Sequence, residues 1–533
     1  MSETNNSTSN QFYEHWTITK PAIHSTKGLV ASQHYLASKV GVEVLQKGGN
    51  AVDAAVATGL ALGIVEPAMS GIGGGGFMTV YSRKLDQVQV VEFGMRAPFA
   101  AQHLDYPLTG NVTGASSFNW PEVENDRNVH GPLSIAVPGY VKGVSLALER
   151  FGTWKWNDVI QPACSLAKKG LPTNWYMVHY ITKSARLMRK YEEINRFYLG
   201  DGLPPETDNE DTSQNHIPLG NLAETYRTLK DEGPDSFYLG TIARKVVADL
   251  NHAGSKITTN DLIDYRAYVT DPLRYDYREN EIYTPTRRSA GPTLARTLAE
   301  LQKKKSATKT TEPTALDYRL YTETLLEAYQ YRLSNLGDGA IEELGSGATS
   351  HICVADKDGN LVSLTQTLMS SFGSYVMLPQ TGILMNNGMM WFDPRPSRAN
   401  SVEGGRYPLS NMCPTIGRTI DGRMFALGAC GGRQIFPAVY QIVSFLCDFG
   451  MDVNDAVHQP RVDVSGTDLV TIMDHLSDEA INHLQEHFVN TQVRKNGMSP
   501  VLFGVPQLIT RSENGQLSGG CMIPSPMAAV LKL

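Results

Sequence analysis

The sequence has few cysteines and no apolar run that could cross a membrane. Six cysteines are scattered over 533 residues, with the spacing of neither a metal site nor a disulfide framework: Cys164, Cys353, Cys413, Cys430, Cys447 and Cys521. The apolar run Ala51–Val65 is shorter than a membrane span and contains Asp53, so it predicts a buried core helix. We therefore expect reduced thiols, no metal, no organic cofactor and no membrane partner.

A surplus of positive charge and an apolar leader are also missing. Lys and Arg number 47 against 54 Asp and Glu, and the resulting net charge of −7 argues against nucleic acids and anionic membranes as partners. The first ten residues, MSETNNSTSN, are polar and lack the apolar region of a signal peptide. These features predict a cytoplasmic protein.

Glycine is concentrated in one motif, Gly71–Phe77 (GIGGGGF), which could be interpreted as a phosphate-binding loop. In dinucleotide-binding proteins such a loop follows a strand and opens a helix. Here the pattern predicts a helix before the motif and a strand after it. The order argues against a nucleotide site.

A small-residue turn runs into a strand-like pattern at Gly345–Val354 (GSGATSHICV), and the strand opens on Thr349. Attack of the Thr349 hydroxyl on the Ala348 carbonyl would cut the chain and free the α-amino group of Thr349. An α-amino group has a pKa of roughly 7.7–8.0, and a threonine paired with its own amine is an activated nucleophile. The alternative is an ordinary strand that begins with threonine.

The residues that follow predict a hairpin. The run from Thr349 reaches a turn at Asp356–Asn360, and Leu361–Thr367 resumes with β-branched residues. The return strand would bring Thr367 beside Thr349, where a second hydroxyl can orient the amine or the nucleophile. The alternative for Thr367 is a cross-strand surface pair.

Seven sequence blocks in a fixed order resemble one family, the γ-glutamyltransferase family of N-terminal-nucleophile hydrolases. The blocks are Gly48–Ala57, Gly73–Met78, Val137–Gly139, Thr349–Asp356, Thr381–Asn387, Pro408–Thr415 and Gly428–Gly432. The resemblance implies that Thr349 is the nucleophile, Thr367 orients its amine, and Gly431 and Gly432 form the oxyanion hole. Glycines suit that role because backbone N–H groups can approach an oxyanion with no Cβ in the way.

The sequence differs from the family at the residues that bind the amino-acid end of a γ-glutamyl group. The family's carboxylate-binding Arg, counted from Ala97–Pro98, falls on His103, and its ammonium-binding Asp falls on Trp391. A supporting Asn falls on Met369. Imidazole does not replace the charged fork of Arg, and indole does not replace a carboxylate, although a cation–π contact is conceivable.

Some of the residues that bind the amino-acid end in the family are kept here, and other residues could replace those that are lost. Ser410 is kept, and Asn411 stands at the position of a second serine, so both remain candidates for binding a carboxylate. Arg96 could supply a positive charge from a shifted position, and Asp393 could replace the lost Asp.

Three functions follow from these residues. The first is cleavage of γ-glutamyl or related acyl amides, small-molecule substrates, through an acyl-enzyme. The second is an acylase or small amidohydrolase, of the oxamate or β-lactam side-chain type, without specificity for γ-glutamyl groups. The third is a binding protein that has lost catalysis; the retention of Thr349, Thr367, Gly431 and Gly432 argues against it.

The resemblance implies an α/β (α+β) fold, a four-layer αββα sandwich built jointly by two chains from one precursor. We expect a polar tail at 1–25, a large subunit at 26–348 and a small subunit at 349–533, with one shared core. Helical spacing at 36–47, 51–65 and 315–336, and strand patterns at 77–81 and 87–93, fit this architecture.

Overall fold

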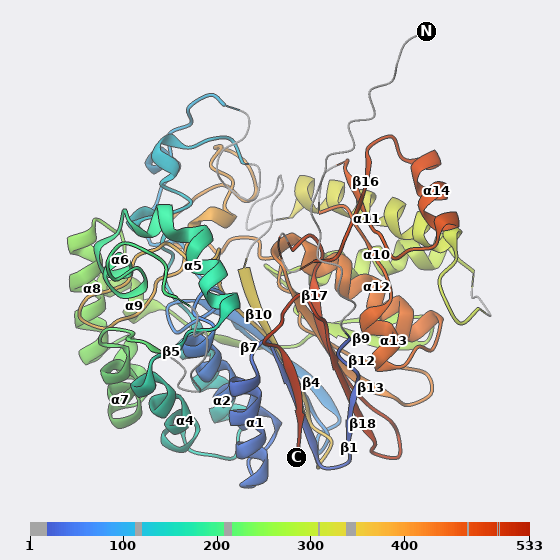
Figure 1. The fold of residues 1–533 in the computed structure, drawn as a ribbon, viewed down its shortest axis with the longest axis horizontal. Helices are drawn as coiled ribbons and strands as arrows, with labels where there is room; N and C mark the ends of the chain where they lie inside the picture. The colour runs from blue at the N-terminus through green and yellow to red at the C-terminus, as the bar shows by residue number, and fades with distance from the viewer. Residues whose placement is uncertain are drawn as a thin grey trace.

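Two sheets lie face to face in the molecule, and helices cover the outer side of each sheet (Figure 1). The computed structural model describes residues 19–111, 120–206, 216–306, 310–336, 348–465, 468–497, 499 and 501–533. Each sheet has seven strands. The arrangement confirms the predicted αββα sandwich.

The first sheet carries the predicted hairpin at its centre. Its strands are antiparallel, in the order β19-β2-β10-β11-β3-β4-β7. Their bounds are β2 Gly28–Ser32, β3 Gly75–Ser82, β4 Gln87–Phe93, β7 Tyr268–Thr270, β10 Ala348–Asp356, β11 Leu361–Met369 and β19 Ala529–Lys532. The hairpin β10–β11 therefore lies between two strands, β2 and β3, that precede it by more than half the chain.

The second sheet is also antiparallel, in the order β1-β18-β17-β13-β12-β9-β8. The bounds are β1 Ile23–Ser25, β8 Leu273–Tyr277, β9 Asn280–Thr284, β12 Thr415–Arg418, β13 Met424–Cys430, β17 Val505–Arg511 and β18 Leu517–Cys521. Because β1 pairs with β18, residues 23–25 belong to this sheet and not to the predicted polar tail. Residues 1–18 of that tail lie outside the described residues.

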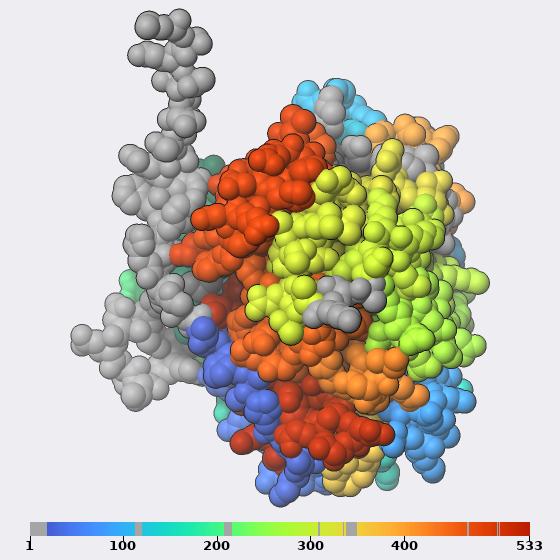
Figure 2. All heavy atoms as spheres, turned by 90° about the vertical axis from the view of Figure 1, so that its right-hand side faces the viewer, coloured from blue at the N-terminus to red at the C-terminus, as the bar shows by residue number. Residues whose placement is uncertain are grey.

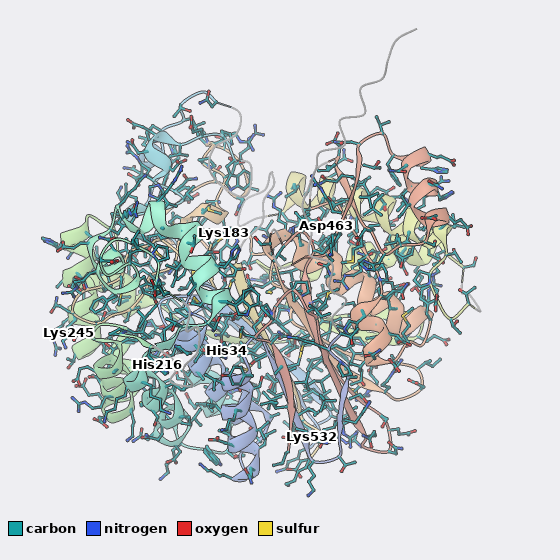
Figure 3. All side chains as sticks on the ribbon, viewed as in Figure 1. His34, Lys183, His216, Lys245, Asp463 and Lys532 are labelled. Carbon is teal, nitrogen blue, oxygen red and sulfur yellow. The ribbon has the colours of Figure 1, made fainter. Side chains whose placement is uncertain are left out.

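Three helices pack on the first sheet: α1 Tyr35–Gln46, α2 Ala51–Val65 and α3 Tyr140–Phe151. The Asn50 side chain caps α2 by accepting hydrogen bonds from the backbone N–H of Val52 and Asp53. His34, labelled in Figure 3, caps α1 through Leu36 N. The whole of α2 is buried, as its apolar run predicts, and it precedes the Gly71–Phe77 motif, which leads into β3.

The opposite layer consists of α10 Gly291–Lys304, α12 Ile435–Asp448 and α13 Val453–His458, which pack on the second sheet. Two further helices, α11 Ala315–Asn335 and α14 Asp478–His487, pack against each other at the surface of this side. Figure 2 faces this layer, with α11 in yellow-green and the later helices in orange and red.

The remaining elements are α4 Trp156–Lys169, α5 Trp175–Met188, α6 Glu192–Tyr198, α7 Leu222–Glu232, α8 Thr241–Ala253, α9 Thr259–Asp264, β5 Leu171–Pro172, β6 His216–Ile217, β14 Val462–Asp463, β15 Val470–Met473, β16 Thr491–Arg494 and the 3₁₀ turns η1 His103–Asp105, η2 Glu124–Asp126, η3 Pro132–Ser134, η4 Pro234–Phe237, η5 Gly388–Trp391 and η6 Gly432–Gln434. Among the residues described, no helix combines the length and apolarity of a membrane span.

The chain segments before and after the 348–349 bond contribute to the same hydrophobic core. The largest buried cluster combines residues such as Val30 and Leu60 with Ile352 and Leu364 from the hairpin. Both sheets also mix strands from before and after that bond. Neither part could bury its apolar surface without the other.

Candidate active site

Thr349 and Thr367 meet at the open end of the β10–β11 hairpin. The register pairs Ala348 with Met369 and Ser350 with Gln366, with an irregularity between Ala348 and Ser350 that places Thr349 in a bulge. Thr349 Oγ1 donates to Thr367 Oγ1 at 3.4 Å, and both side chains are buried. The predicted approach of the two hydroxyls is thus present in the uncut chain.

Thr367 Oγ1 also accepts a hydrogen bond from Met369 N at 2.7 Å. Met369 has φ 91°, in the left-handed region that non-glycine residues other than Asn and Asp rarely adopt. The resemblance places an Asn at this position. Met369 therefore has a backbone conformation that an Asn at this position would adopt more readily.

Replacing Thr367 with Val keeps the shape of the side chain and removes its oxygen. We expect self-cleavage and turnover to slow about tenfold, because the mutation removes the partner of Thr349 and leaves Met369 N, a buried donor, unsatisfied. The rate of band splitting on a denaturing gel and kcat report the effect.

Thr365→Val is the matched control, since Thr365 lies two residues earlier on the same strand and its hydroxyl contacts His351 Nδ1 at 2.9 Å. Equal slowing in both variants would contradict a specific role for Thr367.

His351 lies between the two sheets and does not serve as a base for Thr349. Its ring contacts Thr365 Oγ1 at 2.9 Å and Cys353 Sγ at 3.2 Å, and burial lowers its pKa to about 3. A Cβ on Gly428 of the facing strand β13 would come within 2.2 Å of the ring, so glycine is required there. His351 therefore remains a neutral core residue.

A buried polar network lies behind the nucleophile. Ser350 Oγ donates to Glu66 Oε2 at 3.0 Å and accepts from Ser70 Oγ at 3.0 Å. Gln366 Nε2 donates to Ser70 Oγ at 2.9 Å and to Gly59 O at 3.0 Å. The network anchors the residue after Thr349 to the end of α2.

Glu66 is fully buried, and burial raises its pKa to about 8, against the opposing hydrogen bond from Ser350. In the unfolded chain this carboxyl ionises near pH 4.5, whereas in the folded chain it keeps its proton up to about pH 8. The folded state therefore binds more protons over this window, and its stability falls as the pH rises through it.

Glu66→Gln removes this titration and keeps an oxygen that can accept from Ser350. We expect the unfolding free energy of the variant not to fall between pH 4.5 and 8. At pH 8 it should therefore exceed that of the wild type by about 3–5 kcal/mol. Urea denaturation at pH 5 and pH 8, in a Thr349→Ala background that keeps the chain in one piece, measures it.

Glu149→Gln, at an exposed carboxyl on α3, is the control and should leave the profile unchanged. A Glu66→Gln profile with the wild-type decline would show that Glu66 is not the group responsible.

Gly431 and Gly432 follow the end of β13, at the start of η6. Gly431 has φ 124° and Gly432 has φ 60°, a conformation that favours glycine at both positions. Within the described part of the chain, neither backbone N–H donates to a protein acceptor. Two unpaired N–H groups on adjacent residues suit the binding of an oxyanion.

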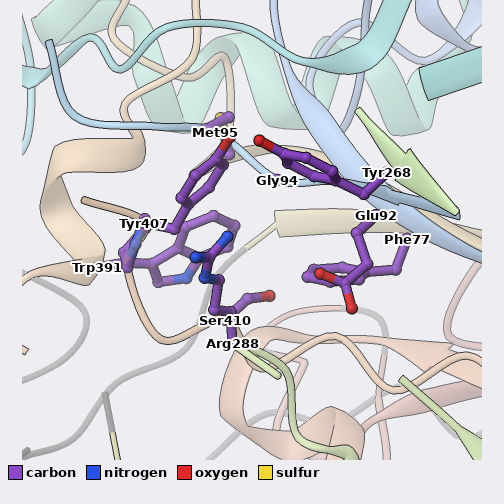
Figure 4. Close-up of a pocket in the computed structure, with 10 residues that line it drawn as sticks. Phe77, Glu92, Gly94, Met95, Tyr268, Arg288, Trp391, Tyr407 and Ser410 are labelled. Carbon is purple, nitrogen blue, oxygen red and sulfur yellow. The ribbon is translucent and has the colours of Figure 1, made fainter. Parts of the chain in front are cut away.

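A pocket lies beside β3, the strand that pairs with β11 (Figure 4). Phe77 of β3 forms part of its wall and pairs with Thr365, two residues before Thr367. The lining residues are Phe77, Glu92, Gly94, Met95, Tyr268, Arg288, Trp391, Tyr407, Pro408 and Ser410. The hollow is narrow in the uncut chain, about 10 Å³, or room for about one water molecule. An acyl group therefore requires movement of its walls.

Arg288 is the functional candidate that sequence reasoning missed. Its guanidinium lies over the Tyr407 ring at 4.1 Å from the centroid, and its carbonyl accepts from Ser410 N at 2.9 Å. Glu92 also lines the pocket. Burial raises the pKa of its carboxyl, and the nearby positive charge of Arg288 opposes that rise. The pocket thus contains a cation beside a predicted substrate-binding serine.

Ser410 and Asn411 are held by the buried residue Arg332 of α11. Arg332 donates to Ser410 O at 2.7 Å and to Asn411 Oδ1 at 3.1 Å. Burial lowers the pKa of Arg332 to about 10, so the side chain remains charged at neutral pH. Of these two candidates, Ser410 lines the pocket.

The pocket lining does not include Arg96, His103 or Asp393. Arg96 forms an ion pair with Asp264 at 2.7 Å and donates to Asp261 O at 3.1 Å, so its charge serves the packing of α9. His103 is exposed on η1. Asp393 is buried and paired with Arg395 at 2.8 Å. Arg96 and His103 are absent from the pocket lining, whereas Trp391 forms part of its wall.

A family model, Gamma-glutamyltranspeptidase, matches residues 37–346 and 339–522. The chain is 29% identical over 544 residues to the glutathione hydrolase proenzyme of Bacillus subtilis (strain 168), covering 92% of this chain and 89% of the relative. It is 31% identical over 542 residues to the acylase ACY 1 proenzyme of Pseudomonas sp. (strain SE83), covering 95% and 93%.

Among solved structures, the cephalosporin acylase of Bacillus halodurans superimposes with a TM-score of 0.84 at 21% identity and covers 98% of both chains. This likeness supports the fold of an N-terminal-nucleophile hydrolase. The matched model covers most of the chain and both relatives are named proenzymes, so the chain belongs to the γ-glutamyltranspeptidase family of N-terminal-nucleophile amidohydrolases.

Proposed function

We propose that the chain is an N-terminal-threonine amidohydrolase that matures by cutting itself between Ala348 and Thr349. The contact of Thr349 Oγ1 with Thr367 Oγ1 at 3.4 Å, at an irregular point of the hairpin, supports this proposal. Cutting would give pieces of 348 and 533 − 348 = 185 residues. They would stay together, because β10 and β11 pair with β2 and β3.

In the proposed reaction the freed amine of Thr349 takes the proton from Thr349 Oγ as that oxygen attacks the substrate amide carbon. The N–H groups of Gly431 and Gly432 would stabilise the oxyanion. The leaving amine receives the proton, and the acyl group remains on Thr349 as an ester. Attack by water then releases the acid and restores the hydroxyl.

The preferred acyl group, in this proposal, carries a distal carboxylate and no α-ammonium. The single observation behind it is the pocket that combines the cation Arg288 with the indole of Trp391. A guanidinium and the Ser410 hydroxyl can bind a carboxylate. Trp391 occupies the position where the family places an ammonium-binding Asp, and Asp393, its nearest carboxylate in sequence, is engaged by Arg395.

Three anilides test this preference: glutaryl p-nitroanilide, γ-glutamyl p-nitroanilide and butyryl p-nitroanilide. The glutaryl compound equals the γ-glutamyl one without its amine, and the butyryl compound also lacks the carboxylate. We expect the highest kcat/KM for the glutaryl compound. A strong preference for γ-glutamyl would contradict the argument and favour an ordinary γ-glutamyl hydrolase, whereas no turnover of any amide would favour the catalytically inactive alternative.

A further inference from the structure

The helix α14 carries three potential metal ligands on one face. His483, Glu486 and His487 have i, i+3, i+4 spacing, which places their side chains next to one another. Each offers one ligand atom, and these atoms all lie within 4.8 Å of one another. The helix is ordered at its start by the Ser477 side chain, which accepts from Ala480 N, and it packs on α11.

The hydrogen bond of the His487 imidazole favours metal binding. His487 Nδ1 lies 2.7 Å from His483 O, and because a carbonyl only accepts, this contact assigns the proton to Nδ1. The lone pair of His487 is then on Nε2. In metal sites a ligating histidine commonly donates its other N–H to a carbonyl in the same manner.

His483 is the second imidazole of the cluster. Its Nε2 is buried, and among the described residues it has no hydrogen-bond partner. The two rings lie with their centroids 4.2 Å apart at 42°. A buried nitrogen without a partner loses solvation and gains nothing in return, so a ligand at this point would remove a cost already present in the fold.

We propose that α14 binds one divalent transition-metal ion, with Zn²⁺ as the test ion, through His483, Glu486 and His487. Two imidazole nitrogens and one carboxylate oxygen are a donor set that Zn²⁺ accepts, with water in the open position. The ligand atoms need to move from separations within 4.8 Å to tetrahedral separations, and rotation of the exposed Glu486 and His487 side chains toward His483 allows this. The acidic residues Asp478 and Glu479 one turn earlier favour a cation nearby.

The site is distinct from the acyl-transfer site, since α14 belongs to the outer layer beside α11 (Figure 1). Its expected effect is on stability. An ion that binds the folded chain and not the unfolded one raises the apparent stability with its concentration. Protons compete for the imidazole lone pairs, so the effect should weaken at acid pH.

Isothermal titration of tag-free, EDTA-treated full-length protein with ZnCl₂ tests the site. We expect one equivalent to bind, with the affinity reduced by at least about tenfold in His483→Gln and in His487→Gln. His475→Gln, at an exposed histidine beside Asp474, is the matched control and should bind like the wild type. Circular dichroism of each variant checks that α14 and its surroundings remain folded.

A second readout is the melting temperature with and without Zn²⁺. The wild type and His475→Gln should be stabilised, and His483→Gln and His487→Gln should not. Equal affinities in all four proteins, or no saturable binding by the wild type, would overturn the proposal.

Discussion

Thr349→Ala should give a single band near 58.5 kDa on a denaturing gel, whereas the wild type should give two bands of about 38 and 20 kDa from the 348:185 division of the mass. The hydroxyl of Thr349 is the only group of that side chain that can attack the Ala348 carbonyl. Its loss should abolish both cutting and amide turnover.

Thr349→Ser provides the control, because it keeps a hydroxyl and should still cut itself. Circular dichroism should show that the uncut alanine variant is folded, since the buried contacts of the hairpin do not depend on the cut. Two bands from Thr349→Ala at the same masses would indicate an external protease and would contradict self-cleavage.

Arg288→Gln should lower kcat/KM for glutaryl p-nitroanilide by about 100-fold. Hydrogen bonds to charged groups contribute about 1.5–3 kcal/mol, which corresponds to roughly 10- to 150-fold in rate. The loss should be much smaller for butyryl p-nitroanilide, which has no carboxylate to bind. Steady-state kinetics on the two anilides separates a role in carboxylate recognition from general damage to the pocket.

Arg287→Gln is the neighbouring control, because Arg287 is exposed whereas Arg288 lines the pocket. It should behave like the wild type on both substrates. If Arg288→Gln reduces turnover of both anilides equally, Arg288 supports the pocket without recognising the carboxylate.

Local elements could be predicted from the sequence because their signals are local. The cap at Asn50 and the apolar run after it predicted the bounds of α2, and the turn at Asp356–Asn360 predicted the hairpin. The order of the strands could not be predicted in this way. The pairing of β10 with β2 depends on contacts between distant parts of the chain, which no local pattern reports.

The candidate substrate-binding residues also divide into those with a local sequence signal and those that depend on tertiary contacts. Trp391 and Ser410 could be proposed from the sequence because they lie inside recognisable blocks, and both line the candidate pocket. Counting along the chain assigned His103 to the position of the family's Arg, and Arg96 was proposed as a positive charge from a shifted position. In the structure His103 is exposed and Arg96 forms an ion pair with Asp264. Arg288 follows β9 and has no motif around it.

Arg288 reaches the pocket only through tertiary packing. Its carbonyl accepts a hydrogen bond from Ser410 N, and its side chain lies on Tyr407. The isolated pair Arg287-Arg288 was the only sequence signal, and such pairs are common on surfaces. Residues 337–347, the segment before the proposed cut, lie outside the described residues.

The most direct test of the account is intact-mass and N-terminal analysis of purified wild-type protein that turns over an amide. Self-maturation predicts two polypeptides, one ending at Ala348 and one beginning with Thr349 and carrying a free α-amino group. An active preparation in which the bond between residues 348 and 349 is unbroken would contradict the account.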